Sequence, residues 1–85
     1  MYRISYHPRA IKFIKKLSKK DSVKLVLKIK KLSNPPYQKN LNIKKLTGIP
    51  NSFRLRDGAI RVIFEINNKK QIIYINDIDF RGNIY

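Results

Sequence analysis

Apolar residues recur along the chain with two different spacings, which separate its strands from its helices. Residues 2–6 alternate between apolar and polar and predict a short strand. Pro8 follows and suits the first turn of a helix. The next apolar positions have the three- and four-residue spacing of a helix: Ala10, Phe13, Ile14 and Leu17. The N-terminal part therefore predicts a strand followed by an amphipathic helix.

A second helix is predicted directly after the first. Ser18 and Asp21 have the spacing of a capping box, which marks a helix start. A broad apolar stripe then runs through the segment: Val23, Leu25, Val26, Leu27, Ile29 and Leu32. Asn34-Pro35-Pro36 ends the helix. Two helices joined by a short polar link predict an antiparallel helical hairpin.

The rest of the chain predicts a loop and three strands. The loop covers residues 35–51, with Ile43, Leu46 and Ile49 as its anchors, and the strands cover about 52–56, 59–66 and 71–78. Asp57-Gly58 is a strong signal for a two-residue hairpin turn, because both central positions of such a turn need positive φ. The order is β-α-α-β-β-β. Residues 1–85 are expected to form a single α+β domain, an antiparallel sheet with the helical hairpin packed on one face.

The hairpin turn fixes which strand residues share a face of the sheet. With Asp57-Gly58 as the turn, Arg54 is expected opposite Arg61. Since side chains alternate, the core face takes an apolar set: Phe53, Leu55, Ile60, Val62, Phe64, Ile73 and Ile75. The other face takes three arginines and three residues of the last strand: Arg54, Arg56, Arg61, Ile72, Tyr74 and Asn76. Like charges directly opposite one another destabilise a sheet, and such an unfavourable arrangement is expected mainly at functional sites. Three converging arginines therefore favour an anion site.

The charge of the chain points to a polyanionic partner. Twenty Lys and Arg against five Asp and Glu give a net charge of +15 over 85 residues. Such an excess is typical of proteins that bind nucleic acid, an acidic protein or anionic lipid. Most lysines lie in the first half of the chain, whereas most arginines lie in the second: Arg54, Arg56, Arg61 and Arg81. Arginine offers a planar, bidentate fork to phosphate, so these arginines are the candidate ligands.

Composition excludes several classes of protein. The chain has no cysteine and one histidine, which leaves no disulfide framework, no thiolate site and no zinc cage. No apolar stretch reaches the ~18 residues of a membrane helix, and no signal peptide opens the chain. We therefore expect a soluble, cytoplasmic protein with no cofactor and no membrane partner.

Segments in the second half of the chain resemble the RelE/ParE toxin superfamily. They are Lys45-Leu46-x-Gly48, Phe53-Arg54-Leu55-Arg56-Asp57-Gly58-x-x-Arg61-Val62-x-Phe64-Glu65-Ile66, and Asp79-Phe80-Arg81-Gly82-Asn83-Ile84-Tyr85. The R-x-R-x-G-x-x-R spacing together with a terminal R-x-x-x-Y is the specific part. The resemblance implies the toxin of a type II toxin–antitoxin pair. RelE-like members enter the ribosomal A site and cleave messenger RNA, so the implied partners are a cognate antitoxin, mRNA and the ribosome.

The resemblance also implies roles for individual residues. Arg61 matches the arginine that holds the scissile phosphate, and Arg81 matches one proposed to stabilise the transition state. Tyr85 matches the terminal tyrosine that stacks on or orients the nucleotide. Arg54 and Arg56 occupy two basic positions that are lysines in the best-studied members, one of them a proposed general base. Arginine is effectively never deprotonated, so Arg54 is a poor conventional base and the identity of the base is left open.

The predicted site combines catalytic and RNA-binding positions. The catalytic residues are Arg54, Arg61, Arg81 and Tyr85, and the RNA-binding residues are Lys44, Lys45, Arg56 and Tyr74. RNA supplies its own nucleophile, the 2′-OH, so the protein needs only to align it and to stabilise charge on the phosphorane, without a metal ion. His7 is interpreted as a strand–helix junction residue, and Glu65 as the partner of Arg61.

Two other functions remain as alternatives. A ParE-like member would poison DNA gyrase and would not be a nuclease, but that branch generally lacks the terminal pattern formed by Arg81 and Tyr85. A non-enzymatic module that binds RNA or the ribosome needs only the net charge of +15. The ribonuclease is preferred over the gyrase inhibitor, and the binding module ranks third.

Overall fold

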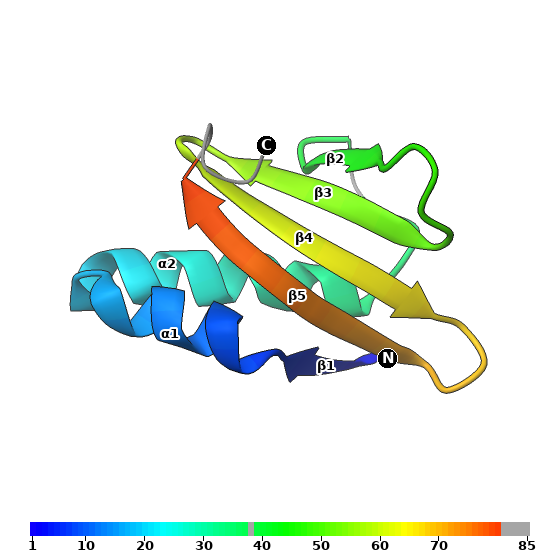
Figure 1. Ribbon diagram of the computed structural model, residues 1–85, viewed down its shortest axis with the longest axis horizontal. Coiled ribbons are helices and arrows are strands. Elements are labelled where there is room, and N and C mark those ends of the chain that lie inside the picture. Colours follow the sequence, from blue (N-terminus) through cyan, green and yellow to red (C-terminus); the bar gives the residue numbers. More distant parts are fainter. Residues whose placement is uncertain (38, 81–85) are drawn as a thin grey trace.

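Among the residues that the structure describes, 1–37 and 39–80, five strands form one mixed sheet and two helices cover one of its faces (Figure 1). In this computed structural model the elements in chain order are β1 (Arg3–Tyr6), α1 (Pro8–Lys16), α2 (Lys19–Lys30), the short 3-10 helix η1 (Lys31–Ser33), β2 (Asn42–Lys45), β3 (Ser52–Asp57), β4 (Ile60–Asn67) and β5 (Ile72–Phe80). The strand order across the sheet is β1-β5-β4-β3-β2. The predicted α+β class, with a helical hairpin on one face of a sheet, is confirmed.

Both helices begin where the sequence predicts. His7 is the N-cap of α1: its Nδ1 accepts a hydrogen bond from the backbone N–H of Arg9 at 3.1 Å, and Pro8 occupies the first turn. Ser18 caps α2 through its Oγ, which accepts from the backbone N–H of Asp21 at 3.2 Å. These side chains satisfy backbone donors that the first turn of a helix leaves unpaired.

The core lies between the helices and the covered face of the sheet. Both layers contribute fully buried residues: Ala10, Leu25, Ile29, Leu32, Leu55, Val62, Phe64, Ile73 and Ile75. Val23 and Leu27, predicted to belong to the apolar stripe of the second helix, are instead 51% and 56% exposed. That part of the prediction is wrong, because at about 100° per residue these two positions fall on the opposite side of α2 from Leu25 and Ile29.

A short edge strand, β2, lies inside the segment that the sequence predicts as a loop. It pairs antiparallel with β3, where Ile43 lies opposite Leu55. Ile43 is the only apolar residue in this strand, so the sequence gives no alternating signal there. Of the predicted loop anchors, Ile43 and Leu46 are half-buried but Ile49 is 54% exposed, and Leu41 is buried instead.

The sheet is mixed, whereas the sequence predicts an antiparallel one. β1 runs parallel to β5, with Arg3 opposite Ile72 and Tyr6 opposite Ile75. The other neighbouring strands are antiparallel. Alternation in residues 2–6 indicates a strand but carries no information about its direction, which is set by how the chain returns to the sheet after the helical hairpin.

The β3–β4 hairpin is shifted by two residues from the predicted register. The turn consists of Gly58 and Ala59, with Gly58 at a φ of 59°, and Arg56 lies opposite Arg61. A glycine with positive φ at the first of two central positions is typical of a type II′ turn. The expectation that Arg54 lies opposite Arg61 is wrong, but a shift of two residues preserves the face of every side chain.

An irregularity in β5 changes which of its side chains face the core. Ile63 on β4 lies opposite Asp77, whereas the next residue of β4 lies opposite Ile75. Asn76 is therefore the extra residue of a β-bulge. Before the bulge the predicted alternation holds, and Ile75 is buried; beyond it the alternation is inverted, so Ile78 is buried and Asp77 belongs to the face away from the helices.

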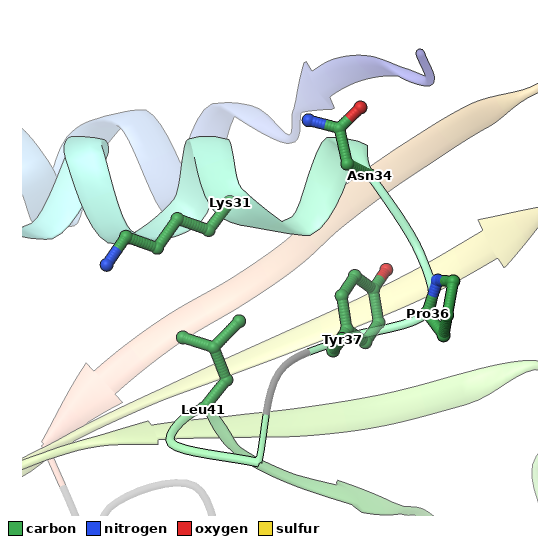
Figure 2. Close-up of a pocket in the computed structure, with 5 residues that line it drawn as sticks. All are labelled: Lys31, Asn34, Pro36, Tyr37 and Leu41. Carbon is green, nitrogen blue, oxygen red and sulfur yellow. The ribbon is translucent and has the colours of Figure 1, made fainter.

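A small pocket opens between the end of the helical layer and the sheet (Figure 2). Its volume is about 250 Å³, and it is lined by Lys31, Asn34, Pro36, Tyr37 and Leu41. Tyr37 packs edge-on against Phe64, with 6.2 Å between the ring centroids. Its hydroxyl oxygen is buried and has no hydrogen-bond partner in the described part of the chain. Burial, followed by the influence of Tyr2, raises the pKa of Tyr37 to about 12.

The variant Tyr37→Phe tests the state of this hydroxyl. At neutral pH it should match the wild type or exceed its free energy of unfolding by up to about 1 kcal/mol, because the buried hydroxyl lacks a partner. In the wild type, the raised pKa means that stability is complete below the ordinary pKa of about 10 and declines as pH rises towards about 12. Urea unfolding across this range should show a smaller alkaline loss in the variant. Equal alkaline losses of unfolding free energy in both proteins would contradict the raised pKa of the Tyr37 hydroxyl.

Candidate anion-binding site

Cationic side chains gather on the face of the sheet that the helices leave uncovered. Lys44 on β2 lies opposite Arg54 on β3, and Arg56 on β3 lies opposite Arg61 on β4. Directly opposite residues have Cβ atoms about 5 Å apart, and diagonal neighbours such as Arg54 and Arg61 about 7–8 Å. We call this group the cationic face: Lys44, Arg54, Arg56 and Arg61. The prediction that the three arginines share one face is confirmed.

The arginines of the cationic face are half-buried in spite of their charge. The Nε of Arg54 is buried and has no hydrogen-bond partner among residues 1–37 and 39–80. A polar N–H group that is withdrawn from water and lacks an acceptor carries a desolvation cost. An anion that accepts from this guanidinium would remove that cost and would also reduce the repulsion among the neighbouring cations.

The loop between β2 and β3 turns the cationic face into a hollow. We call it the cationic hollow; its volume is about 490 Å³, and it is lined by Lys44, Lys45, Leu46, Thr47, Ile49, Arg54 and Arg61. Gly48 lies within this loop at a φ of 82°, a conformation that L side chains rarely adopt. The hollow therefore combines cationic with apolar side chains, which suits a ligand that carries both phosphate and flat apolar groups.

The carboxylate nearest to Arg61 along the strand register is not the one that the sequence predicts. Asp79 on β5 lies opposite Arg61. Glu65 lies opposite Tyr74, four residues and about 13 Å further along β4. The prediction that Glu65 partners Arg61 is therefore wrong. The β-bulge at Asn76 brings Asp79 to this face, and the three-residue spacing of Ile75 and Ile78 is the sequence signal that indicates such a bulge.

The structure brings together part of the predicted site. Lys44, Lys45, Arg54 and Arg61 line the cationic hollow, and Arg56 is adjacent. Tyr74 is on the same face but is displaced by roughly 13 Å along the sheet from the position opposite Arg61. Arg81 and Tyr85 lie outside the described residues, so their places and roles stay predictions.

The chemistry that this arrangement can perform is phosphate binding and stabilisation of negative charge. Arginine side chains hold a phosphate by bidentate, charge-assisted hydrogen bonds. Cations fixed in advance at a reacting phosphate stabilise the charge that develops there. In the described part of the chain, no three His, Asp or Glu side chains are grouped as a metal site requires. No helix there is long and apolar enough to cross a membrane.

Comparison with solved structures identifies the fold. The chain superposes with a TM-score of 0.82 and 27% identity on a chain of the archaeal RelE–RelB complex from Pyrococcus horikoshii, covering 95% of this chain and 96% of that one. It matches the isolated Escherichia coli RelE toxin with a TM-score of 0.77 and 19% identity, covering 100% and 92%. For the RelB–RelE antitoxin–toxin complex of Methanococcus jannaschii the TM-score is 0.76 and the identity 24%, covering 95% and 94%.

The class defined by these matches is an α+β protein with the RelE fold. No family model matches the sequence, and no curated protein matches it significantly. The structural likeness over nearly the full length of both chains nevertheless places this protein in the RelE/ParE-like toxin superfamily.

The variant Arg54→Gln tests whether the cationic face is a cluster of mutually repelling charges. It should raise the free energy of unfolding at low ionic strength by a few tenths of a kcal/mol to about 1 kcal/mol, because one of the repelling cations is removed. The gain should shrink in about 1 M salt, where the Debye length is about 3 Å. Urea unfolding at both salt concentrations measures the effect, with Lys12→Gln on α1 as the control. A variant less stable than the wild type at low salt would argue against the cluster.

Proposed function

We propose that this chain is the toxin of a type II toxin–antitoxin pair and that it cleaves messenger RNA on the ribosome. The observation that carries the proposal is the cationic hollow on the open face of a RelE-like sheet. Structural relatives include RelE toxins and RelE–RelB complexes. The net charge of +15 supports a polyanionic substrate.

The proposed reaction is transesterification within the RNA strand. The 2′-oxygen attacks the adjacent phosphorus, its proton is lost, and the 5′-oxygen of the next nucleotide leaves and takes up a proton. The products are a 2′,3′-cyclic phosphate, or the 3′-phosphate formed from it by hydrolysis, and a 5′-hydroxyl end. No metal-bound water is required, because the nucleophile belongs to the substrate.

In this mechanism the cationic face holds the scissile phosphate. Arg61 binds the phosphate directly, and Arg54 adds positive charge beside it as the phosphorane forms. Lys44 and Lys45 line the same hollow and hold neighbouring phosphates of the strand, with Arg56 adjacent. Each of these assignments depends on positive charge rather than on proton transfer.

Arg81 and Tyr85 complete the proposed mechanism. By resemblance to the superfamily, Arg81 stabilises the transition state and Tyr85 stacks on or orients the nucleotide. Both residues lie outside the described residues, so these roles rest on the sequence pattern alone.

The proposed protein partner is a cognate antitoxin with an acidic segment. The structural relatives in antitoxin complexes support such a partner. An acidic segment that covers the cationic face would neutralise its repulsion and block the substrate phosphate. Apolar side chains of the same segment would find partners in exposed residues such as Ile49, which lines the cationic hollow and is 54% exposed.

The variant Arg61→Ala should lower the cleavage rate by a factor on the order of 10²–10³, because it removes a charge that stabilises the transition state. Lys12→Ala on α1 is the matched control and should cleave at nearly the wild-type rate. The rate is measured from the appearance of new message ends in a purified translation system. Early inhibition of DNA gyrase with intact messages would favour the ParE-like alternative instead.

A further inference from the structure

A second hollow adjoins the cationic hollow on the same face of the sheet. Its volume is about 460 Å³, and it is lined by His7, Arg9, Leu46, Ile49, Ile63, Asn76 and Asp77. Leu46 and Ile49 line both hollows, so the β2–β3 loop forms the wall between them. Ile63 follows Arg61 by two residues on the same face of β4, a separation of about 7 Å. A nucleotide whose phosphate is bound at Arg61 can therefore reach the second hollow with its base.

The bulge in β5 is what supplies this second hollow with a carboxylate. Asp77 lies opposite Ile63 because Asn76 is inserted between the two registers of the β4–β5 pairing. Without the extra residue, regular alternation from Ile75 would direct Asp77 towards the core. Bulges are over-represented next to active sites, where they change the direction of a side chain.

The polar groups of this hollow are available to a ligand. Asp77 is half-buried, and its carboxylate forms no hydrogen bond or ion pair with any other described residue. The ring of His7 is held in place, since its Nδ1 accepts from both the backbone N–H and the Nε of Arg9, at 3.1 and 3.2 Å. These contacts hold the Arg9 side chain against the His7 ring, and both residues line the hollow. Three aliphatic side chains form its apolar walls: Leu46, Ile49 and Ile63.

We propose that this hollow is a base-binding subsite, in which Asp77 selects a nucleobase that carries an exocyclic amino group. The inference deepens the proposed ribonuclease function and rests on it. The apolar walls contact the faces of the base, as aliphatic side chains do in nucleobase pockets. The subsite receives one of the two nucleotides that flank the phosphate at Arg61.

The chemical basis of the selection is the donor pattern on the edge of the base. An ionised carboxylate only accepts hydrogen bonds. The N4 amino group of cytosine donates to it, as in known Asp and Glu contacts to cytosine. Uracil presents the O4 acceptor at the same position, so the two oxygens repel. Cytosine and uracil have the same ring size, which makes them a matched pair for a test.

The test compares the binding of oligo(C) and oligo(U) of equal length by fluorescence anisotropy. Both carry the same number of phosphates, so the electrostatic contribution to binding is shared. Wild-type protein should bind oligo(C) about tenfold more tightly than oligo(U), the range expected for a good base contact. Equal affinities would overturn the proposal. An ion pair between Asp77 and Arg9 across the hollow in solution would produce this result and would therefore overturn it too.

The variant Asp77→Asn assigns the selectivity to this side chain. An amide both donates and accepts, so it can pair with uracil as well as with cytosine. The ratio of the two affinities should fall to about one, even though removal of a negative charge tightens both complexes. Asp21→Asn, on α2, removes the same charge elsewhere and should keep the tenfold ratio. A ratio that persists in Asp77→Asn would show that another group selects the base.

The outcomes separate this inference from the function on which it rests. RNA binding and message cleavage without a preference between cytosine and uracil would remove the subsite alone. Absence of both RNA binding and cleavage would overturn the ribonuclease function and the subsite together.

Discussion

The antiparallel pairing of β3 with β4 is the constraint on which both the core and the candidate anion-binding site depend. Leu55 and Val62 lie opposite one another and are fully buried beneath the helices. Arg56 and Arg61, their neighbours in the chain, also lie opposite one another, but on the uncovered face. A slip of one residue would carry arginines into the core, so burial of the apolar set holds the repelling cations in place. The ion pair between Lys28 and Asp57, at 3.0 Å, joins α2 to the end of the same hairpin.

Period-two alternation explains how much of the site is predictable from the sequence. The faces of Arg54, Arg56 and Arg61 follow from parity alone, and parity survives a register error of two residues. The exact register depends on whether the turn is Asp57-Gly58 or Gly58-Ala59. Both options place a glycine where positive φ is required, so local sequence does not distinguish them.

Features that depend on tertiary pairing could not be predicted from the sequence. β2 has a single apolar residue, and this segment forms a strand because it pairs with β3. The bulge at Asn76 reverses the faces of the last residues of β5 and brings Asp79 opposite Arg61, whereas Glu65 was predicted as the partner because it shares the face of the arginines. Helical periodicity likewise included Val23 and Leu27, because a broad stripe does not indicate which edge of the helix meets the sheet.

In the proposed function, the two hollows give the open face two different kinds of contact with RNA. Contacts between arginine and phosphate position a strand without reading its sequence, whereas contacts to base edges carry the specificity. The β2–β3 loop separates the two, and its apolar residues belong to both hollows. In the proposed complex, one short loop thus relates the position of a phosphate to the position of its neighbouring base.

In the proposed mechanism the RNA itself supplies the nucleophile to a phosphate held by the cationic face. The most direct measurement maps the cleavage ends produced by the purified protein on a message bound to ribosomes, and then repeats the reaction with the 2′-OH at the cleaved position replaced by hydrogen. We expect cleavage of the normal message to a 2′,3′-cyclic phosphate or 3′-phosphate end, and no cleavage of the deoxy-substituted one. Cleavage of the deoxy-substituted message at the same position would contradict this mechanism.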